Sequence, residues 1–206
     1  MKDENGERVN GMSMNQPQSN YSYADYLESS EEIRYEVIDG QIISMSPAPT
    51  PKHQHVQREL LIEFGTYLRG KECSVFGSPI DVCLFANQTT PNEKIKDWVQ
   101  PDIVVICDRN KINPQNIVGA PDLVIEILSP STARNDRVIK FNNYQKAGVR
   151  EYWIVDPSNE YVEVFLLQNN RFISSGFYTK EDSIKVNIFE DLSIELKHVF
   201  QDDSGK

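Results

Sequence analysis

The chain has 206 residues, of which 39% are hydrophobic and 25% charged, and its net charge is −10. This length and composition are typical of one globular domain with a hydrophobic core and argue against a disordered chain. No apolar run is long enough to cross a bilayer, and the N-terminus lacks the apolar middle of a secretory signal, so we expect a cytoplasmic protein with no membrane partner. The cysteines at 73, 83 and 107 form no CxxC pair, which predicts neither a disulfide framework nor a zinc ribbon.

The first half of the chain shows clear local signals. Residues 1–20 are polar and aperiodic, which predicts a disordered tail before a single domain at 21–206. Residues 23–32 are predicted to form a short helix, and residues 34–46 alternate around Asp39-Gly40, which predicts a β-hairpin. Helical spacing of apolar residues predicts a helix over 53–68, and residues 74–85 are predicted to form a strand.

The second half alternates strands with one long helix. Residues 102–107 and 122–128 are predicted as short apolar strands joined by a turn-rich connection. A helix is expected from SPSTARND to Lys146, ending at Ala147-Gly148, followed by a strand in EYWIVDP. Further short strands are expected at 161–167, 171–178, 183–189 and 192–196. This order predicts an α/β (α+β) fold, with a mixed β-sheet flanked by helices and extra C-terminal strands.

Two acidic residues lie within the short apolar strands. Asp102 shares a strand face with Val104 and Ile106, and Glu126 shares one with Val124 and Leu128. If the two strands pair antiparallel, Asp102 can lie opposite Glu126 with Cβ atoms about 5 Å apart. Two ionised acids at that distance call for a divalent cation such as Mg²⁺. The alternative is that each acid is solvated at a strand end.

A second Pro-Asp pair, Pro121-Asp122, competes for the same role. Asp122 lies on the same predicted strand as Glu126, four residues earlier, which is roughly 13 Å at strand spacing. That is too far to share one ion, so we expect Asp122 to be a turn or strand-start residue.

Lys140 follows in the predicted helix. A lysine beside a metal-bound phosphate can neutralise developing charge or lower the pKa of an attacking water. The alternative is a surface pair with Asp136, four positions earlier on the same helical face. Tyr144, one turn further along, is either a phosphate donor or a cap on that face.

The segments PDIVVICD and GAPDLVIEILSPSTARNDRVIKFNNYQKAGVREYWIVDP, preceded by YEVIDGQIISMSPAP and a helix containing histidine, resemble the Uma-two family of bacterial endonucleases. The resemblance covers about residues 22–198. It implies the restriction-endonuclease-like superfamily, whose signature is PD…(D/E)xK and whose metal site lies at strand ends of a mixed sheet.

The resemblance implies roles for individual residues. Asp102 takes the signature aspartate, Glu126 takes the signature acid, and the carbonyl of Ile127 becomes a further metal ligand. The signature lysine is absent because Leu128 occupies its position. In this family the lysine moves to the following helix, which makes it Lys140.

Further candidates come from other segments. Glu36 is either a fourth acid of the site or a solvated hairpin carboxylate, and His55 is a possible additional site residue. The segment 131–150 carries five basic residues against one acidic residue, whereas residues 1–50 and 151–206 are acidic. Arg134 and Arg137 in this basic segment are expected to contact a nucleic-acid backbone.

These features predict a Mg²⁺- or Mn²⁺-dependent endodeoxyribonuclease, with Asp102, Glu126 and Lys140 as its catalytic residues and DNA as its partner. The alternative is a nuclease fold that no longer cuts and serves as a nucleic-acid- or protein-binding module, which the acidic surface favours. An acyl hydrolase lacks support because the sequence has no GxSxG motif. The extra C-terminal strands suggest a homodimer.

Overall fold

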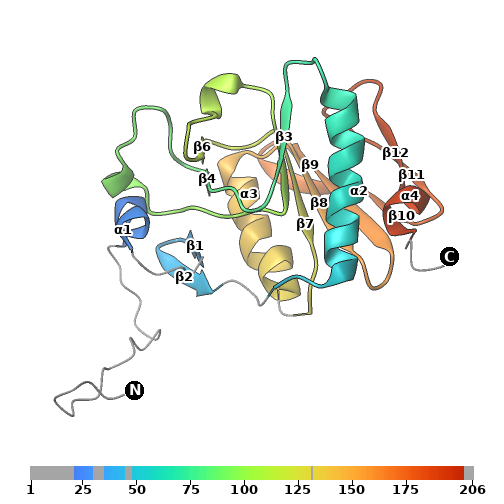
Figure 1. Cartoon of the computed structure of the whole chain (residues 1–206), viewed down its shortest axis with the longest axis horizontal. Helices are drawn as coiled ribbons and strands as arrows, with labels where there is room; N and C mark the ends of the chain where they lie inside the picture. The colour runs from blue at the N-terminus through green and yellow to red at the C-terminus, as the bar shows by residue number, and fades with distance from the viewer. Residues whose placement is uncertain (1–20, 30–34, 45–47, 131, 202–206) are drawn as a thin grey trace, which may run out of the picture.

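The computed structural model describes residues 21–29, 35–44, 48–130 and 132–201. The tail predicted at 1–20 lies outside these residues. A six-stranded mixed sheet in the order β10-β9-β8-β7-β5-β3 forms the centre of the fold (Figure 1). Its strands are β3 (Ser74–Gly77), β5 (Ile103–Ile106), β7 (Leu123–Ile127), β8 (Glu151–Asp156), β9 (Tyr161–Gln168) and β10 (Arg171–Thr179). The predicted mixed sheet flanked by helices is therefore confirmed.

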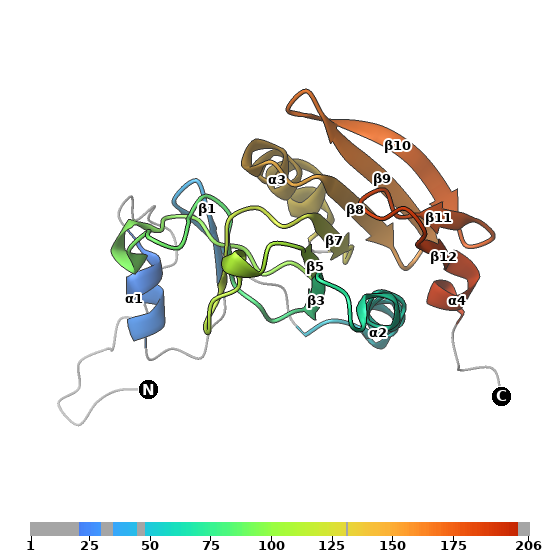
Figure 2. The same ribbon diagram turned by 90° about the horizontal axis from the view of Figure 1, so that it is seen from above.

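Helices cover both faces of this sheet (Figure 2). On one face, α2 (Pro51–Leu68) and α4 (Leu196–Phe200) bury a core that includes Val56, Leu60 and Trp153. On the other face, α3 (Phe141–Ala147) and the π-helix η3 (Asn135–Lys140) that precedes it close a second core. No helix in the described part of the chain is both long enough and apolar enough to cross a bilayer.

The N-terminal elements form a smaller unit beside the sheet. The hairpin β1 (Tyr35–Ile38) and β2 (Gln41–Ser44) turns at Asp39 and Gly40, whose φ angles are 50° and 70°. Positive φ at both positions is what a two-residue hairpin of this kind requires, and it confirms the predicted hairpin. A third core around Trp98 joins β1 to α1 (Tyr23–Glu28).

The central strands are paired as the sequence predicted. β5 and β7 are antiparallel, with Ile103 opposite Ile125 and Val105 opposite Leu123. β7 and β8 are parallel and are connected by η3 and α3. The helix ends at Gly148, whose φ of 93° provides the expected left-handed C-terminal residue.

Short elements complete the fold. They are β4 (Val82–Cys83), the 3-10 helix η1 (Asn92–Lys94), the 3-10 helix η2 (Arg109–Lys111), β6 (Ile117–Val118), β11 (Ser183–Lys185) and β12 (Ser193–Glu195). β4 pairs with β6, and β11 pairs with β12.

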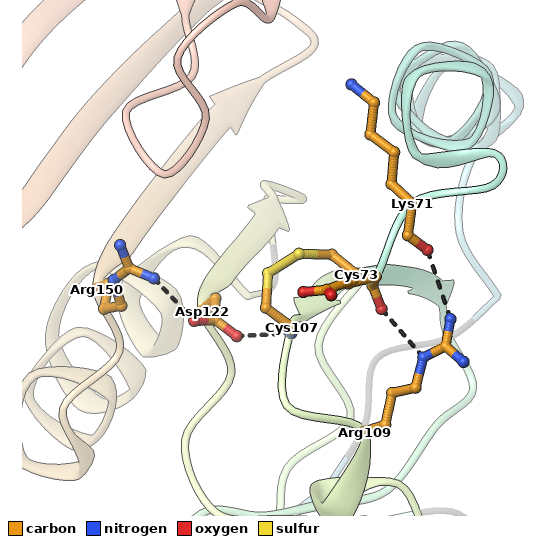
Figure 3. Close-up of a disulfide and its surroundings, with 7 residues drawn as sticks. Lys71, Cys73, Cys107, Arg109, Asp122 and Arg150 are labelled. Atoms are coloured by element: carbon orange, nitrogen blue, oxygen red, sulfur yellow. Dashed lines mark hydrogen bonds and ion pairs between the residues drawn. A yellow bond between two sulfur atoms is a disulfide. The ribbon is translucent and has the colours of Figure 1, made fainter.

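The strand expected at 192–196 is present as β12 (Ser193–Glu195), after which Leu196 begins α4. Two local predictions were wrong. The single strand expected at 74–85 is split into β3 and β4, and the segment between them contains Pro79, which has no backbone N–H to donate to a sheet. The sequence indicated no disulfide, yet Cys73 and Cys107 are bonded across β3 and β5 (Figure 3). Residues 34 positions apart meet there because Ser74 pairs with Ile106 next to them.

Candidate active site

Asp102 and Glu126 converge at the ends of β5 and β7. Extending the register of Ile103 and Ile125 by one residue places Asp102 opposite Glu126. The Asp102 carboxylate lies against β7, since its Oδ2 accepts a 2.7 Å hydrogen bond from the backbone N–H of Ile127. The neighbours of both acids on their strand face, Val104 and Val124, belong to the core under α3. The antiparallel register of β5 and β7 is the one that the predicted opposition of these two positions requires.

Lys140, in η3, and Tyr144, in α3, both donate hydrogen bonds to the carboxylate of Glu126. The Lys140 ammonium donates to Glu126 Oε1 at 3.0 Å, and the Tyr144 hydroxyl donates to the same oxygen at 2.5 Å. The side chains of Glu126 and Lys140 are only 4% and 7% exposed, so the surface pair considered for Lys140 does not describe its environment. Both helix residues reach the strand acid because η3 and α3 pack on the face of the sheet from which Glu126 projects.

Two further acids complete the contacts of Lys140. Its Nζ lies 2.8 Å from Glu36 Oε1 and 3.7 Å from Asp136 Oδ1. Glu36 comes from β1 and is 4% exposed, so it is not a solvated hairpin carboxylate. The backbone N–H of Gln100 also donates to Glu36 Oε1 at 2.7 Å, which fixes this acid to the segment before Asp102. Asp136 is buried as well, and the sequence reading considered it only as a surface partner of Lys140.

The cluster around Lys140 contains more buried carboxyl groups than buried basic groups, since Glu36, Glu126 and Asp136 surround one ammonium. Burial raises the pKa of Glu126 well above its usual value, and the charges of Asp136, Asp102 and Glu36 raise it further although Lys140 opposes them. Burial also raises the pKa of Asp136 to about 6. Burial alone would lower the pKa of Lys140, but Glu126, Glu36 and Asp136 outweigh it and raise that pKa. Lys140 therefore stays charged while three carboxyl groups share its single positive charge.

His53, to which the sequence analysis assigned no role, lies beside Asp102. It lies in the first turn of α2 with its Nε2 3.3 Å from Asp102 Oδ2. Burial lowers the pKa of His53, but hydrogen bonds to Asp102 and to the Ile127 backbone and the charge of Asp102 raise it overall. Helical spacing could have found it, because His53 precedes Val56 and Leu60 by three and seven positions and so shares their buried face.

The donor set suits a hard divalent cation. Two carboxylates and the Ile127 carbonyl would all be oxygen ligands, and the raised pKa of Glu126 means that its ionised form lacks a compensating positive charge, which a bound cation would supply. Within the described ranges, no three His, Cys, Asp or Glu side chains already converge as a metal cluster. Mg²⁺ keeps several waters and is commonly bound through one or two carboxylates plus substrate phosphates, so a three-residue cluster is not required.

The other predicted residues make no contact with these acids within the described part of the chain. His55 contacts Arg58 of its own helix, with Nδ1 3.0 Å from the Arg58 Nη2. Arg134 is exposed at the start of η3. Arg137 pairs with Glu163 on β9 at 2.6 Å, and it donates to the Tyr161 hydroxyl at 2.8 Å.

Comparisons with known proteins agree on one family. A family model described as "Uma2: Putative restriction endonuclease" matches residues 22–197. Two uncharacterized proteins of Synechocystis sp., slr1290 and sll1609, are 29% and 27% identical over 71% and 65% of this chain and 73% of each relative. A crystal structure described as "a putative nuclease belonging to DUF820 from Anabaena variabilis" has a TM-score of 0.68 at 24% identity, covering 87% of this chain and 97% of that one. This similarity shows that the two proteins share a fold.

Proposed function

The chain belongs to the Uma2 family, and we propose that it is a metal-dependent endonuclease that hydrolyses phosphodiester bonds in DNA. One observation carries the proposal, namely the opposition of Asp102 and Glu126 on adjacent antiparallel strands beneath the Lys140 ammonium. Phosphodiester hydrolysis needs positive charge near the phosphate and a deprotonated water, and this cluster is built to hold a cation where both can be supplied.

Asp102, Glu126 and the Ile127 carbonyl would hold Mg²⁺ or Mn²⁺. Such an ion polarises the phosphate and makes a bound water more acidic. The Ile127 backbone would serve twice, because its N–H holds the Asp102 carboxylate and its carbonyl oxygen would be the third ligand. Tyr144 orients Glu126 through its hydrogen bond, since its raised pKa keeps the hydroxyl protonated.

Lys140 holds its proton and orients the surrounding carboxylates. Its contacts with Glu36, Glu126 and Asp136 keep these acids close together although they repel one another. When a substrate is bound, the same ammonium would stabilise negative charge that develops on the phosphate. This role would place the lysine of the family signature on a helix rather than on the strand.

Arg134 and Arg137 are proposed to contact the DNA backbone beside the site. Arg134 is exposed, and Arg137 is partly exposed at the edge of the same helix segment. Arg137 already pairs with Glu163, so a phosphate would have to compete with this carboxylate. We therefore expect Arg134 to contribute more to DNA binding than Arg137.

A non-catalytic binding module is the second candidate. The net charge of −10 and the Arg137–Glu163 pair both favour a module that binds protein, because they weaken binding to a polyanion. The two functions differ in their need for metal. Calorimetric titration with Mn²⁺ separates them, since the absence of binding at millimolar metal would favour the module.

The direct test is incubation with plasmid DNA and single-stranded DNA in Mg²⁺ or Mn²⁺. Wild-type protein is expected to nick or cut plasmid, whereas Glu126→Gln, which keeps the side-chain shape, is expected to be inactive in the same metal. A circular dichroism spectrum of Glu126→Gln that matches the wild type would show that the fold survives. Equal cleavage by the wild type and by Glu126→Gln would contradict the assignment of Glu126 to the active site.

A further inference from the structure

We infer that His53 is a positioning residue, which anchors one oxygen of Asp102 so that the other is directed to the bound cation. This inference rests on the proposed function and adds a residue to its site. The alternative is that the His53 ring only fills space beneath the first turn of α2.

Helix α2 holds residue 102 at two points. Gln57 Nε2 donates to the Asp102 carbonyl oxygen at 2.8 Å, and the backbone N–H of Ser78 donates to that same oxygen at 2.9 Å. One turn earlier on the helix, His53 Nε2 lies 3.3 Å from the Asp102 carboxylate. A single rigid helix therefore fixes both the backbone and the side chain of this residue.

The two carboxylate oxygens of Asp102 have different surroundings. Oδ2 receives the Ile127 N–H at 2.7 Å and the His53 contact. From the described part of the chain, no hydrogen bond or ion pair reaches Oδ1. Two contacts on one oxygen fix the plane of a carboxylate, and the remaining oxygen then has a defined direction. Residues that hold metal ligands in this way commonly tune metal affinity 10- to 100-fold.

The N-terminus of α2 is capped without the imidazole ring of His53. The backbone N–H of His53 is capped by Thr50 Oγ1 at 3.2 Å, and Pro51 occupies the first turn. Nδ1 of the ring is buried and has no hydrogen-bond partner among the residues that the structure describes. The polar contact of this ring is thus with the Asp102 carboxylate.

His55 provides a matched control. It lies two residues further along the same helix, and its contact is with Arg58 rather than with Asp102. Replacing His55 by alanine removes the same side chain from the same helical turn without touching the Asp102 carboxylate.

The experiment measures Mn²⁺ affinity by calorimetry and by electron paramagnetic resonance, without DNA. The proteins are the wild type, His53→Ala, His53→Leu, His53→Gln and His55→Ala, each checked by thermal unfolding in EDTA. We expect His53→Ala and His53→Leu to bind Mn²⁺ 10- to 100-fold more weakly. His53→Gln, which keeps a side-chain donor, is expected to recover part of the loss, and His55→Ala should match the wild type.

Two results would overturn the inference alone, namely wild-type affinity in His53→Ala or an equal loss in His55→Ala. If His53→Ala does not fold, His53→Leu decides, because leucine keeps an apolar side chain of similar bulk in the buried position. A wild-type protein that binds no Mn²⁺ at millimolar concentration would overturn this inference together with the proposed metal site. Failure of DNA cleavage with intact, His53-dependent Mn²⁺ binding would count against the proposed function only.

Discussion

Two Pro-Asp pairs occupy equivalent positions in the antiparallel strands β5 and β7. Asp102 precedes β5 and accepts the backbone N–H of Ile127 at the end of β7, at 2.7 Å. Asp122 precedes β7 and accepts the backbone N–H of Cys107 after the end of β5, at 2.8 Å (Figure 3). The same dipeptide before an apolar strand therefore makes the same local hydrogen bond at both ends of the strand pair.

The neighbours of the two aspartates differ. Glu126 lies opposite Asp102, whereas the same register places the apolar Ile106 opposite Asp122. Asp122 pairs with Arg150, whose side chain is 60% exposed, so its charge is balanced near solvent. Asp102 belongs to a buried cluster in which acids outnumber bases. The difference teaches that local sequence sets the hydrogen bond, while the opposing strand and the helix above decide which aspartate joins the acidic cluster that we propose as a metal site.

The largest difference between the Asp102 end and the Asp122 end of the β5–β7 pair is expected when the basic residue at each end is removed. Lys140→Met leaves three contacting acids without their common cation, so the free energy of unfolding should fall by about 3–5 kcal/mol. Arg150→Met removes an exposed partner of Asp122 and should cost less than about 1 kcal/mol. Urea denaturation at pH 7 in EDTA measures both. Equal losses would mean that Lys140 does not balance the cluster.

Substitution of the aspartates tests the same comparison through activity. Asp102→Asn should lower Mg²⁺-dependent DNA cleavage roughly 10²–10³-fold, the scale on which a preorganised electrostatic group contributes to catalysis. Asp122→Asn should leave cleavage within about twofold, because Asp122 contacts Cys107 and Arg150 instead of the site. Plasmid nicking rates under identical metal conditions decide this, and a comparable loss in both variants would contradict the assignment.

The pH dependence of stability should also distinguish the two ends. Burial raises the pKa of Asp136 to about 6, so between about pH 4 and pH 6 the folded state binds more protons than the unfolded state. The free energy of unfolding of the metal-free protein should therefore fall as pH rises through this window, by about 3 kcal/mol from this group.

Asp136→Asn should reduce this pH-dependent decrease in the free energy of unfolding, whereas Asp122→Asn should leave the decrease as it is in the wild type. Urea denaturation from pH 4 to pH 7 in EDTA provides the measurement. A slope that is identical in wild type and Asp136→Asn would show that Asp136 does not carry this proton.

The smallest effect is expected from the hydroxyl above Glu126. Tyr144→Phe removes one hydrogen bond to Glu126 and should weaken Mn²⁺ binding by less than about tenfold, with a loss of about 1 kcal/mol in stability. Tyr152→Phe is the control, because the Tyr152 hydroxyl donates to the Asp136 carbonyl oxygen rather than to a carboxylate. It should lose similar stability but keep its Mn²⁺ affinity, as calorimetry would measure.

Features that depend on short segments were predictable from the sequence. The hairpin follows from Asp39-Gly40, which accepts positive φ at both positions. The end of α3 follows from Gly148, which adopts the left-handed conformation without steric cost. The shared face of Asp102 and Glu126 follows from the two-residue period of a strand, once the strands are assumed to be antiparallel.

Features that depend on how distant segments meet were decided by the tertiary structure. Glu36 is buried only because the β1–β2 hairpin docks against the segment that contains Gln100. His53, rather than His55, reaches Asp102 because the packing of α2 selects one of its faces. Cys73 and Cys107 are bonded because β3 pairs with β5. The sequence alone thus determined the elements and the two strand acids, since these depend on local backbone geometry. Only the fold decided the charge balance around them, because buried electrostatics depends on neighbours brought together from the whole chain.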